Sequence, residues 1–364
     1  MQKINNSCTL NETLMDITEL LKITIEKRSS DLHIIPGYHP SIRVNGVLYP
    51  LKTYPVLTDE LAKSMLLPLL TDEKKEYLIT NKELDLGYNF EDSRFRINMY
   101  FIRGMIAGAF RLITTKISPL EALNLPPLLH NFTEMQQGFI LVTGPTGEGK
   151  TTTIAAIINE INTKFEKHIL TIEDPIEYLY PPARSIISQR EIGQDTHSWS
   201  IALKSALRED PDVVVIGEMR DYETIQAALT IAETGHLVFS TLHTNSVPQT
   251  IDRIVDVFPS RQQNQVRSQL AVTLRAIISQ RLVPTIDNQS RIPACEILLS
   301  NPAIASIIRE SKTHLLDNVL ETSSDQGMIL LEKYLSNLYL EGKISRETAM
   351  HYAIRSQQIQ KLIR

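Results

Sequence analysis

Cysteine is scarce in this sequence, and there is no excess of positive charge. The 364 residues contain only Cys8 and Cys295, too few and too far apart for a disulfide framework or a four-cysteine zinc site. Lys and Arg total 37 against 42 for Asp and Glu, a formal net charge of -5, and no long basic run is present. A dedicated nucleic-acid-binding protein would usually carry a basic stripe, so we expect no nucleic-acid partner.

Long apolar runs are missing as well. Residues 1–7 are mostly polar and lack the apolar core of a signal peptide. No stretch reaches the ~18 apolar residues that a membrane-spanning helix needs. We therefore expect a cytoplasmic protein with reduced cysteines and no membrane insertion of its own, which another protein would have to recruit to a membrane.

The amino-acid usage is that of a globular protein, with 42% hydrophobic and 22% charged residues, and the length favours two domains. Residues 1–113 predict a small α+β domain on an antiparallel sheet. Apolar residues at helical spacing predict helices over 10–28 and 59–70. Alternating runs predict strands at 32–35, 42–44, 84–90, 94–101 and 107–113, with a hairpin turn at Asn45-Gly46.

A proline-rich segment without a clear period, 114–127, is interpreted as a linker to a second domain, 128–364. The second domain alternates strands at 139–142, 169–172, 213–216 and 237–240 with helices at 151–162, 198–208 and 222–234. This alternation predicts an α/β fold with a parallel sheet between helices, as in RecA-like ATPases. From Arg261 onward the pattern reads as almost wholly helical.

A phosphate-binding loop (P-loop) follows the first strand of the second domain. Its residues are Gly144-Pro145-Thr146-Gly147-Glu148-Gly149-Lys150-Thr151-Thr152. The glycines let backbone N–H groups converge on a phosphate at the start of the next helix. Lys150 would neutralise β- and γ-phosphate oxygens, and the Thr151 hydroxyl would ligate magnesium. We therefore expect a nucleoside triphosphate ligand, with MgATP preferred.

Two carboxylates sit just past the ends of predicted strands, where ligands gather in parallel sheets. Glu177 lies in the run 173–177 after one strand, and Glu218 follows another in the position of a Walker B acid. Either residue could hold magnesium or polarise an attacking water, although a solvated loop position is the alternative for each.

Two histidines flank the strand that begins at Leu237. His236 and His243 could sense a γ-phosphate or polarise water, or each could be a structural residue. No further His or Cys lies at the spacing of a zinc site.

Four arginines cluster on the two predicted strands before the linker, namely Arg94, Arg96, Arg103 and Arg111. They could decorate a solvent face, or a guanidinium could reach a γ-phosphate from a neighbouring domain or subunit. The residues alone leave both options open.

Several blocks, in the right order, resemble the PilT family of type IV pilus retraction (twitching motility) ATPases, within the secretion ATPase superfamily. The resemblance runs over residues 30–347. Residues 170–177 look like the family's Asp box, 207–221 like its Walker B region, and 234–245 like its His box. Such proteins are hexameric ring ATPases with a PAS-like N-terminal domain and a RecA-like C-terminal domain that carries C-terminal helices.

The resemblance implies roles for the residues already singled out. Glu218 would activate water, Glu177 would assist, and His236 and His243 would line the site. Arg96 and Arg111 become the arginine-finger candidates, approaching a nucleotide at the next subunit. ATP and Mg²⁺ are the implied ligands, and a homo-hexamer acting on an inner-membrane pilus platform protein, at the inner face of the cell membrane, is the implied assembly.

Two departures from the family pattern stand out. Glu148 replaces the usual serine of the P-loop, at a position that can face away from phosphate. Ala305 and Ser306 replace an arginine and an asparagine in a motif that the family needs for retraction and not for hydrolysis. The negative charge of Glu148 could weaken nucleotide binding, although activity should survive. The changes at Ala305 and Ser306 leave the retraction-specific role open, but not the ATPase activity.

Four rivals to a retraction motor have their own signatures. A pilus extension ATPase usually has a longer N-terminal region and a four-cysteine zinc site. A conjugation-type secretion ATPase shares the P-loop and the Asp box, but the full run 217–221 favours the retraction branch. A nucleotide-gated scaffold would bind ATP with little turnover, and a DNA-translocating motor is disfavoured by the acidic net charge.

Overall fold

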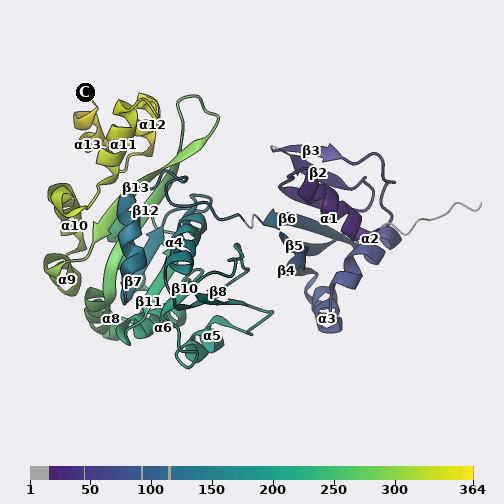
Figure 1. The fold of residues 1–364 in the computed structure, drawn as a ribbon, viewed down its shortest axis with the longest axis horizontal. Helices are drawn as coiled ribbons and strands as arrows, with labels where there is room; N and C mark the ends of the chain where they lie inside the picture. The colour runs from purple at the N-terminus through teal and green to yellow at the C-terminus, as the bar shows by residue number, and fades with distance from the viewer. Residues whose placement is uncertain (1–15, 45, 92, 114–115, 364) are drawn as a thin grey trace, which may run out of the picture. The chain divides into compact units, whose positions relative to one another are not determined.

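The computed structural model describes residues 16–44, 46–91, 93–113 and 116–363, and the chain divides into two compact units (Figure 1). The first unit is Met1–Thr115 and the second is Lys116–Arg364. Residues 10–15 of the expected first helix, Asn45 of the expected hairpin turn and Cys8 lie outside the described residues.

The first unit is a curved antiparallel sheet with helices against it, as the sequence predicts. Its strands lie in the order β3-β2-β1-β6-β5-β4. The strands are β1 Asp31–Ile34, β2 Ser41–Val44, β3 Val47–Pro50, β4 Glu83–Phe90, β5 Ser93–Ile102 and β6 Met105–Ile113. The helices are α1 Ile17–Glu26, α2 Asp59–Leu66, the 3-10 turn η1 Leu67–Leu69, and α3 Asp72–Asn81.

Two elements of the first unit escaped the sequence prediction because they bury little apolar surface. Helix α3 buries only Leu78 among its residues, so it has no apolar stripe at helical spacing. Strand β3 is exposed along its whole length at the edge of the sheet, where it pairs with β2. Neither segment carries the periodic pattern from which an element can be predicted.

The second unit is built on a mostly parallel sheet with the order β13-β12-β7-β11-β10-β8-β9. Its strands are β7 Gly138–Thr143, β8 His168–Glu173, β9 Ile186–Glu191, β10 Val213–Ile216, β11 Leu237–Leu242, β12 Leu274–Pro284 and β13 Arg291–Leu299. Its helices are α4 Lys150–Lys164, α5 Trp199–Ala206, α6 Tyr222–Glu233, α7 Val247–Asp256, α8 Ser260–Thr273, α9 Pro302–Arg309, α10 Leu316–Thr322, α11 Leu331–Leu340, α12 Arg346–Tyr352 and α13 Ser356–Leu362. The 3-10 turns are η2 Pro127–Glu134, η3 Thr313–Leu315 and η4 Ser324–Gln326.

The expectation of an almost wholly helical chain after Arg261 is wrong for residues 274–299. Strand β12 lies parallel to β7, and β13 returns antiparallel to β12. Ala276 and Ile278 point into one apolar cluster of the core and Ile277 into the other, so both faces of β12 are buried. A strand buried on both faces shows no polar alternation, which is why its two-residue period is hidden in the sequence.

Two apolar layers fill the space between the sheet and its helices. Helices α5 to α8 cover one face, and α4 with η2 covers the other. Leu120 and Leu125, from the segment expected to be a linker, are buried in the layer under α4, so that part of the segment belongs to the second unit. Cys295 is a buried free thiol on β13, and burial raises its pKa to about 12.

A buried ion cluster ties the last helices to the hairpin β12–β13. Arg355 lies between α12 and α13, and its Nη1 donates to Glu296 Oε2 at 2.8 Å and to Glu332 Oε2 at 2.9 Å. Both glutamates are fully buried, and Arg355 also pairs with Asp317 on α10. One guanidinium therefore compensates the carboxylates of three separate elements.

Removing the charge of Arg355 should destabilise the second unit strongly. Arg355→Met would leave Glu296 and Glu332 buried without a cation, and breaking a buried ion pair in this way costs about 3–5 kcal/mol. Urea unfolding measures the loss of unfolding free energy, with Arg261→Met at the exposed start of α8 as the matched control. A loss no larger than that of the control would contradict the structural role of Arg355.

Candidate functional site

The P-loop runs from the end of β7 to the start of α4 and depends on its glycines. Gly144, Gly147 and Gly149 have φ values of 147°, 83° and 76°, which disfavour any residue with a Cβ. A Cβ on Gly144 would also lie 2.4 Å from the carbonyl oxygen of Gln280, whereas one on Gly147 would meet nothing within 4 Å. The loop is thus pressed against β12 on one side and open on the other.

The start of α4 leaves backbone donors free. Its N-cap residue is Gly149, and no side chain caps the first N–H groups of the helix. Thr151 and Thr152 follow in the first turn, where the Thr152 hydroxyl contacts the Tyr178 hydroxyl at 2.8 Å. Uncapped N–H groups and the positive end of a helix dipole form a site that suits an anionic oxygen.

Lys150 folds back over the P-loop. Its ammonium donates to the carbonyl oxygens of Gly144 at 2.8 Å and Pro145 at 2.9 Å. Burial lowers the pKa of Lys150, while the nearby carboxylates of Glu218, Glu148 and Glu177 act in the opposite direction. The ammonium is therefore a desolvated cation surrounded by oxygen acceptors.

Glu218 and His243 arrive at the P-loop because β7, β10 and β11 are parallel. Leu242 of β11 lies beside Thr143 of β7, so the residues that follow these strands emerge at one edge. His243 Nε2 lies 3.3 Å from Glu218 Oε2, and its Nδ1 lies 3.5 Å from Thr146 Oγ1. Arg220 also forms an ion pair with Glu218.

The run 173–177 reaches the same edge from β8. Glu173, the last residue of β8, is buried and accepts hydrogen bonds from Thr171 Oγ1 at 2.6 Å and from the backbone N–H of Glu177 at 3.4 Å. Burial is the main cause that raises the pKa of Glu173. Glu177 itself is close enough to Lys150 to favour the charged ammonium.

His236 lies away from this cluster within one chain. It precedes β11, whose first residue Leu237 pairs with Gly138 at the start of β7, whereas the P-loop follows the end of β7. A strand of this length separates the two edges by roughly 20 Å. His236 Nδ1 instead contacts Ile231 O at 3.0 Å and Thr234 Oγ1 at 3.1 Å, so the expectation that both histidines line one site does not hold within a chain.

Arg96 and Arg111 both belong to the first unit. They are direct cross-strand neighbours on β5 and β6. Arg111 Nε donates to Asp31 Oδ1 at 3.0 Å, while its side chain stays 66% exposed. Of the other two arginines, Arg94 is buried and bonds to Asn89, and Arg103 occupies the turn between the strands with a φ of 52°, so it is not on a strand as expected.

Gln280 is a site residue that the sequence analysis missed. Its Nε2 donates to the carbonyl oxygen of Glu148 at 2.6 Å, and its Oε1 accepts from Thr153 Oγ1 at 2.7 Å. Gln280 lies on β12, in a segment that was expected to be helical. Only the recognition that a strand runs beside β7 could have placed this amide behind the P-loop.

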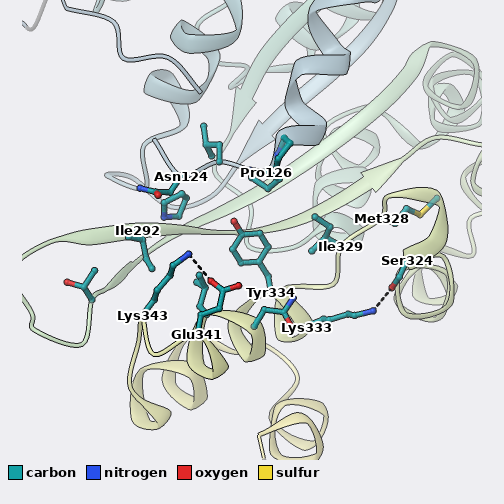
Figure 2. A pocket seen from close by; sticks show the side chains of 16 residues that line it. Asn124, Pro126, Ile292, Ser324, Met328, Ile329, Lys333, Tyr334, Glu341 and Lys343 are labelled. Carbon is teal, nitrogen blue, oxygen red and sulfur yellow. Dashed lines mark hydrogen bonds and ion pairs between the residues drawn. The ribbon is translucent and has the colours of Figure 1, made fainter. Parts of the chain in front are cut away.

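A separate cavity of about 570 Å³ opens between residues 124–127, the β12–β13 hairpin and α11 (Figure 2). Tyr334 stands in its wall, and Lys343 and Glu341 form an ion pair of 2.7 Å at its side. None of the predicted site residues lines this cavity. It is therefore distinct from the P-loop site.

The strand–loop–helix geometry and the acids at the neighbouring strand ends define the class of P-loop ATPases. The family described as type II/IV secretion system protein matches residues 99–350. The chain belongs to this family, and its enzyme class is that of an ATP-hydrolysing secretion-type ATPase.

Individual relatives are similar over nearly the whole chain. The type IV pilus retraction ATPase PilT of Pseudomonas aeruginosa is 41% identical over 340 residues, which cover 93% of this chain and 98% of that protein. A twitching motility protein of Neisseria gonorrhoeae is 44% identical over 342 residues, covering 94% and 91%. The crystal structure of the pilus retraction motor PilT with bound ADP has a TM-score of 0.88 and 42% identity, covering 95% of this chain and 99% of that one.

The raised pKa of Glu173 predicts how stability depends on pH. Because the folded pKa lies above the unfolded value, the stability linked to this group is present at low pH and is lost as the pH rises through the folded pKa. Glu173→Gln removes the ionisation, so the stability of the variant relative to the native chain should increase as the pH rises above the ordinary pKa of a glutamate. Urea unfolding at a series of pH values tests this, and a constant or falling difference would be the contrary result.

Proposed function

We propose that the protein is a hexameric motor that hydrolyses MgATP to power type IV pilus retraction and twitching motility. The observation that carries the proposal is the meeting of Lys150, Glu218 and His243 at one edge of the sheet. The similarity to named retraction ATPases over nearly the whole chain supports the pilus role.

The residues of the loop suit the phosphates of a nucleotide. Uncapped N–H groups begin α4, the space over Gly147 is open, and a desolvated ammonium lies beside both. Phosphate oxygens would replace the carbonyl oxygens as the acceptors for Lys150. This exchange returns the lysine to a strongly anionic environment and stabilises its charged form.

The donor set also suits magnesium, which prefers hard oxygen ligands and keeps some waters and phosphate oxygens. We propose that Thr151, Glu218 and Glu177 are the protein groups that would hold it, directly or through water. Within the described ranges no three His, Cys, Asp or Glu side chains could hold a metal by themselves, which fits an ion bound partly by the nucleotide. When bound, Mg²⁺ would neutralise the charge that develops on the transferred phosphoryl group.

Glu218 is our candidate for the group that activates water. Its carboxylate is held by His243 on one side and by Arg220 on the other, which limits its rotation. A carboxylate oriented in this way can accept a proton from an attacking water as the γ-phosphate leaves. Glu177 would assist from the run after β8, and His243 would line the γ-phosphate position.

We further propose that each nucleotide site is completed by arginines from a neighbouring subunit of the hexameric ring. Arg96 and Arg111 lie side by side on the first unit, and Arg111 could exchange its ion pair with Asp31 for a γ-phosphate at a subunit junction. Nucleotide at each junction would then bias the position of the first unit, and hydrolysis would release it. His236 would act outside the site of its own chain.

The partner in this proposal is an inner-membrane pilus platform protein. The described helices include none that is long and apolar enough to cross a bilayer. We infer a cytoplasmic ring that is recruited to the inner face of the cell membrane by that protein. An extension or conjugation-type secretion ATPase and a scaffold with little turnover remain the alternatives to be separated by experiment.

Deletion of the gene followed by imaging of surface pili tests the pilus role. Hyperpiliated cells that cannot retract their pili are the expected result, because assembly would continue without disassembly. Cells without pili would instead indicate an extension or secretion role. Steady-state phosphate release by the purified protein would exclude the scaffold.

Glu218→Gln should abolish turnover while leaving MgATP bound. The substitution keeps the size of the side chain and removes the base, so kcat should fall by at least ~100-fold. Phosphate release measures kcat, and the matched control is Glu223→Gln, an exposed glutamate in the first turn of α6. Normal turnover in Glu218→Gln would remove Glu218 from the role of water activator.

A further inference from the structure

Glu148 is the one carboxylate inside the P-loop, and its side chain contacts β12. Glu148 Oε2 accepts a hydrogen bond from the backbone N–H of Leu282. The carbonyl oxygen of the same residue accepts from Gln280 Nε2 at 2.6 Å. Both the backbone and the side chain of Glu148 are therefore attached to β12.

Strand β12 can make these contacts because it extends beyond the end of the neighbouring strand β7. β12 pairs with β7 as far as Ser279, which lies beside Thr143, and the remainder of β12 extends past the end of β7. The other side of β12 is occupied by β13 up to Pro284. The P-loop lies beside this part of β12, on the side where β7 has ended. The Glu148 carboxylate accepts from the backbone N–H of Leu282, which would otherwise need a neighbouring strand as its partner.

Two cations lie near the carboxylate of Glu148. Lys150 and Arg281 both lie close enough for Glu148 to favour their charged forms. Arg281 is itself held by Asn245, to whose Oδ1 it donates at 3.1 Å. A carboxylate with two cations and a backbone N–H around it exerts a weakened repulsion on a nearby phosphate.

We propose that Glu148 is a positioning residue that fastens the P-loop to β12 and so holds the loop backbone in its phosphate-binding shape. The inference rests on the proposed nucleotide site and deepens it. A purely electrostatic role makes the opposite prediction, since a negative charge that repels phosphate would weaken nucleotide binding and its removal would tighten it.

Three substitutions separate the two roles. Glu148→Ala removes the acceptor and the charge, Glu148→Ser keeps a hydroxyl too short to reach Leu282, and Glu148→Gln removes the charge but keeps an acceptor of the same length. We expect Glu148→Ala and Glu148→Ser to raise the Kd for MgADP about tenfold, because each loses a charge-assisted hydrogen bond. A tenfold change in Kd corresponds to ~1.4 kcal/mol. Gln should recover most of this loss, with a Kd within about threefold of the native value.

The binding titrations are combined with steady-state kinetics on the full chain. A positioning role raises the KM for ATP by a larger factor than it lowers kcat, because the loop acts on bound phosphates before any chemistry. Glu134→Ala, at an exposed glutamate in η2, controls for the loss of one negative charge. Thermal unfolding checks that each variant is folded. If Glu148→Ala does not fold, the comparison of Glu148→Gln with Glu148→Ser tests the inference.

Two results would overturn the inference. The first is equal or tighter binding of MgADP by the Ala and Ser variants, and the second is a Gln variant as weak as Ala. If the native chain itself fails to bind MgADP, the proposed function fails together with the inference. If the native chain binds and hydrolyses nucleotide while all three variants match it, the function stands and only the role of Glu148 is removed.

Discussion

The site depends above all on one buried cation. The ammonium of Lys150 has left bulk water, and it is held by two loop carbonyls and by the fields of Glu218, Glu148 and Glu177. Burying a charge is unfavourable unless acceptors replace its hydration, so the loop shape and the carboxylates at the neighbouring strand ends must be present together. The parallel order of β7, β10 and β11 meets this condition, because it brings the residues that follow these strands to one edge.

The hairpin β12–β13 connects this edge to the rest of the second unit. One end of β12 holds the P-loop through Gln280 and Leu282, and the next residue, Val283, is buried among the C-terminal helices. On β13, Glu296 accepts from the N–H of Val247 at the start of α7 and from Arg355 between the last two helices. A shift of the hairpin would therefore disturb the P-loop, the segment after His243 and the C-terminal helices at once.

The sequence was enough to predict the helices and strands that are buried on one face only, and the loops that have a characteristic sequence motif. The P-loop was predicted from its glycine motif and Glu218 from its place after a strand, whereas His243 became a candidate through the His box. The structure brings the three together. The hairpin was missed because β12 is buried on both faces. Gln280 was missed with it, because its contact with Glu148 joins residues that lie 132 positions apart in the sequence. His236 was predicted by its place in a motif, but the direction of β11 puts it at the far edge.

The P-loop can carry a carboxylate because neighbouring groups offset its charge. A bound phosphate responds to the sum of all charges and dipoles around it. The Glu148 side chain bonds to a backbone N–H of β12, and Arg281 and Lys150 lie nearby, so its negative charge is partly offset. A residue that looks unfavourable in the linear motif is thus compensated by contacts that exist only after β12 is in place. Since those contacts also attach the loop to the strand, one side chain contributes to both the charge and the shape of the P-loop, and only a substitution that keeps the acceptor, such as Glu148→Gln, changes the charge alone.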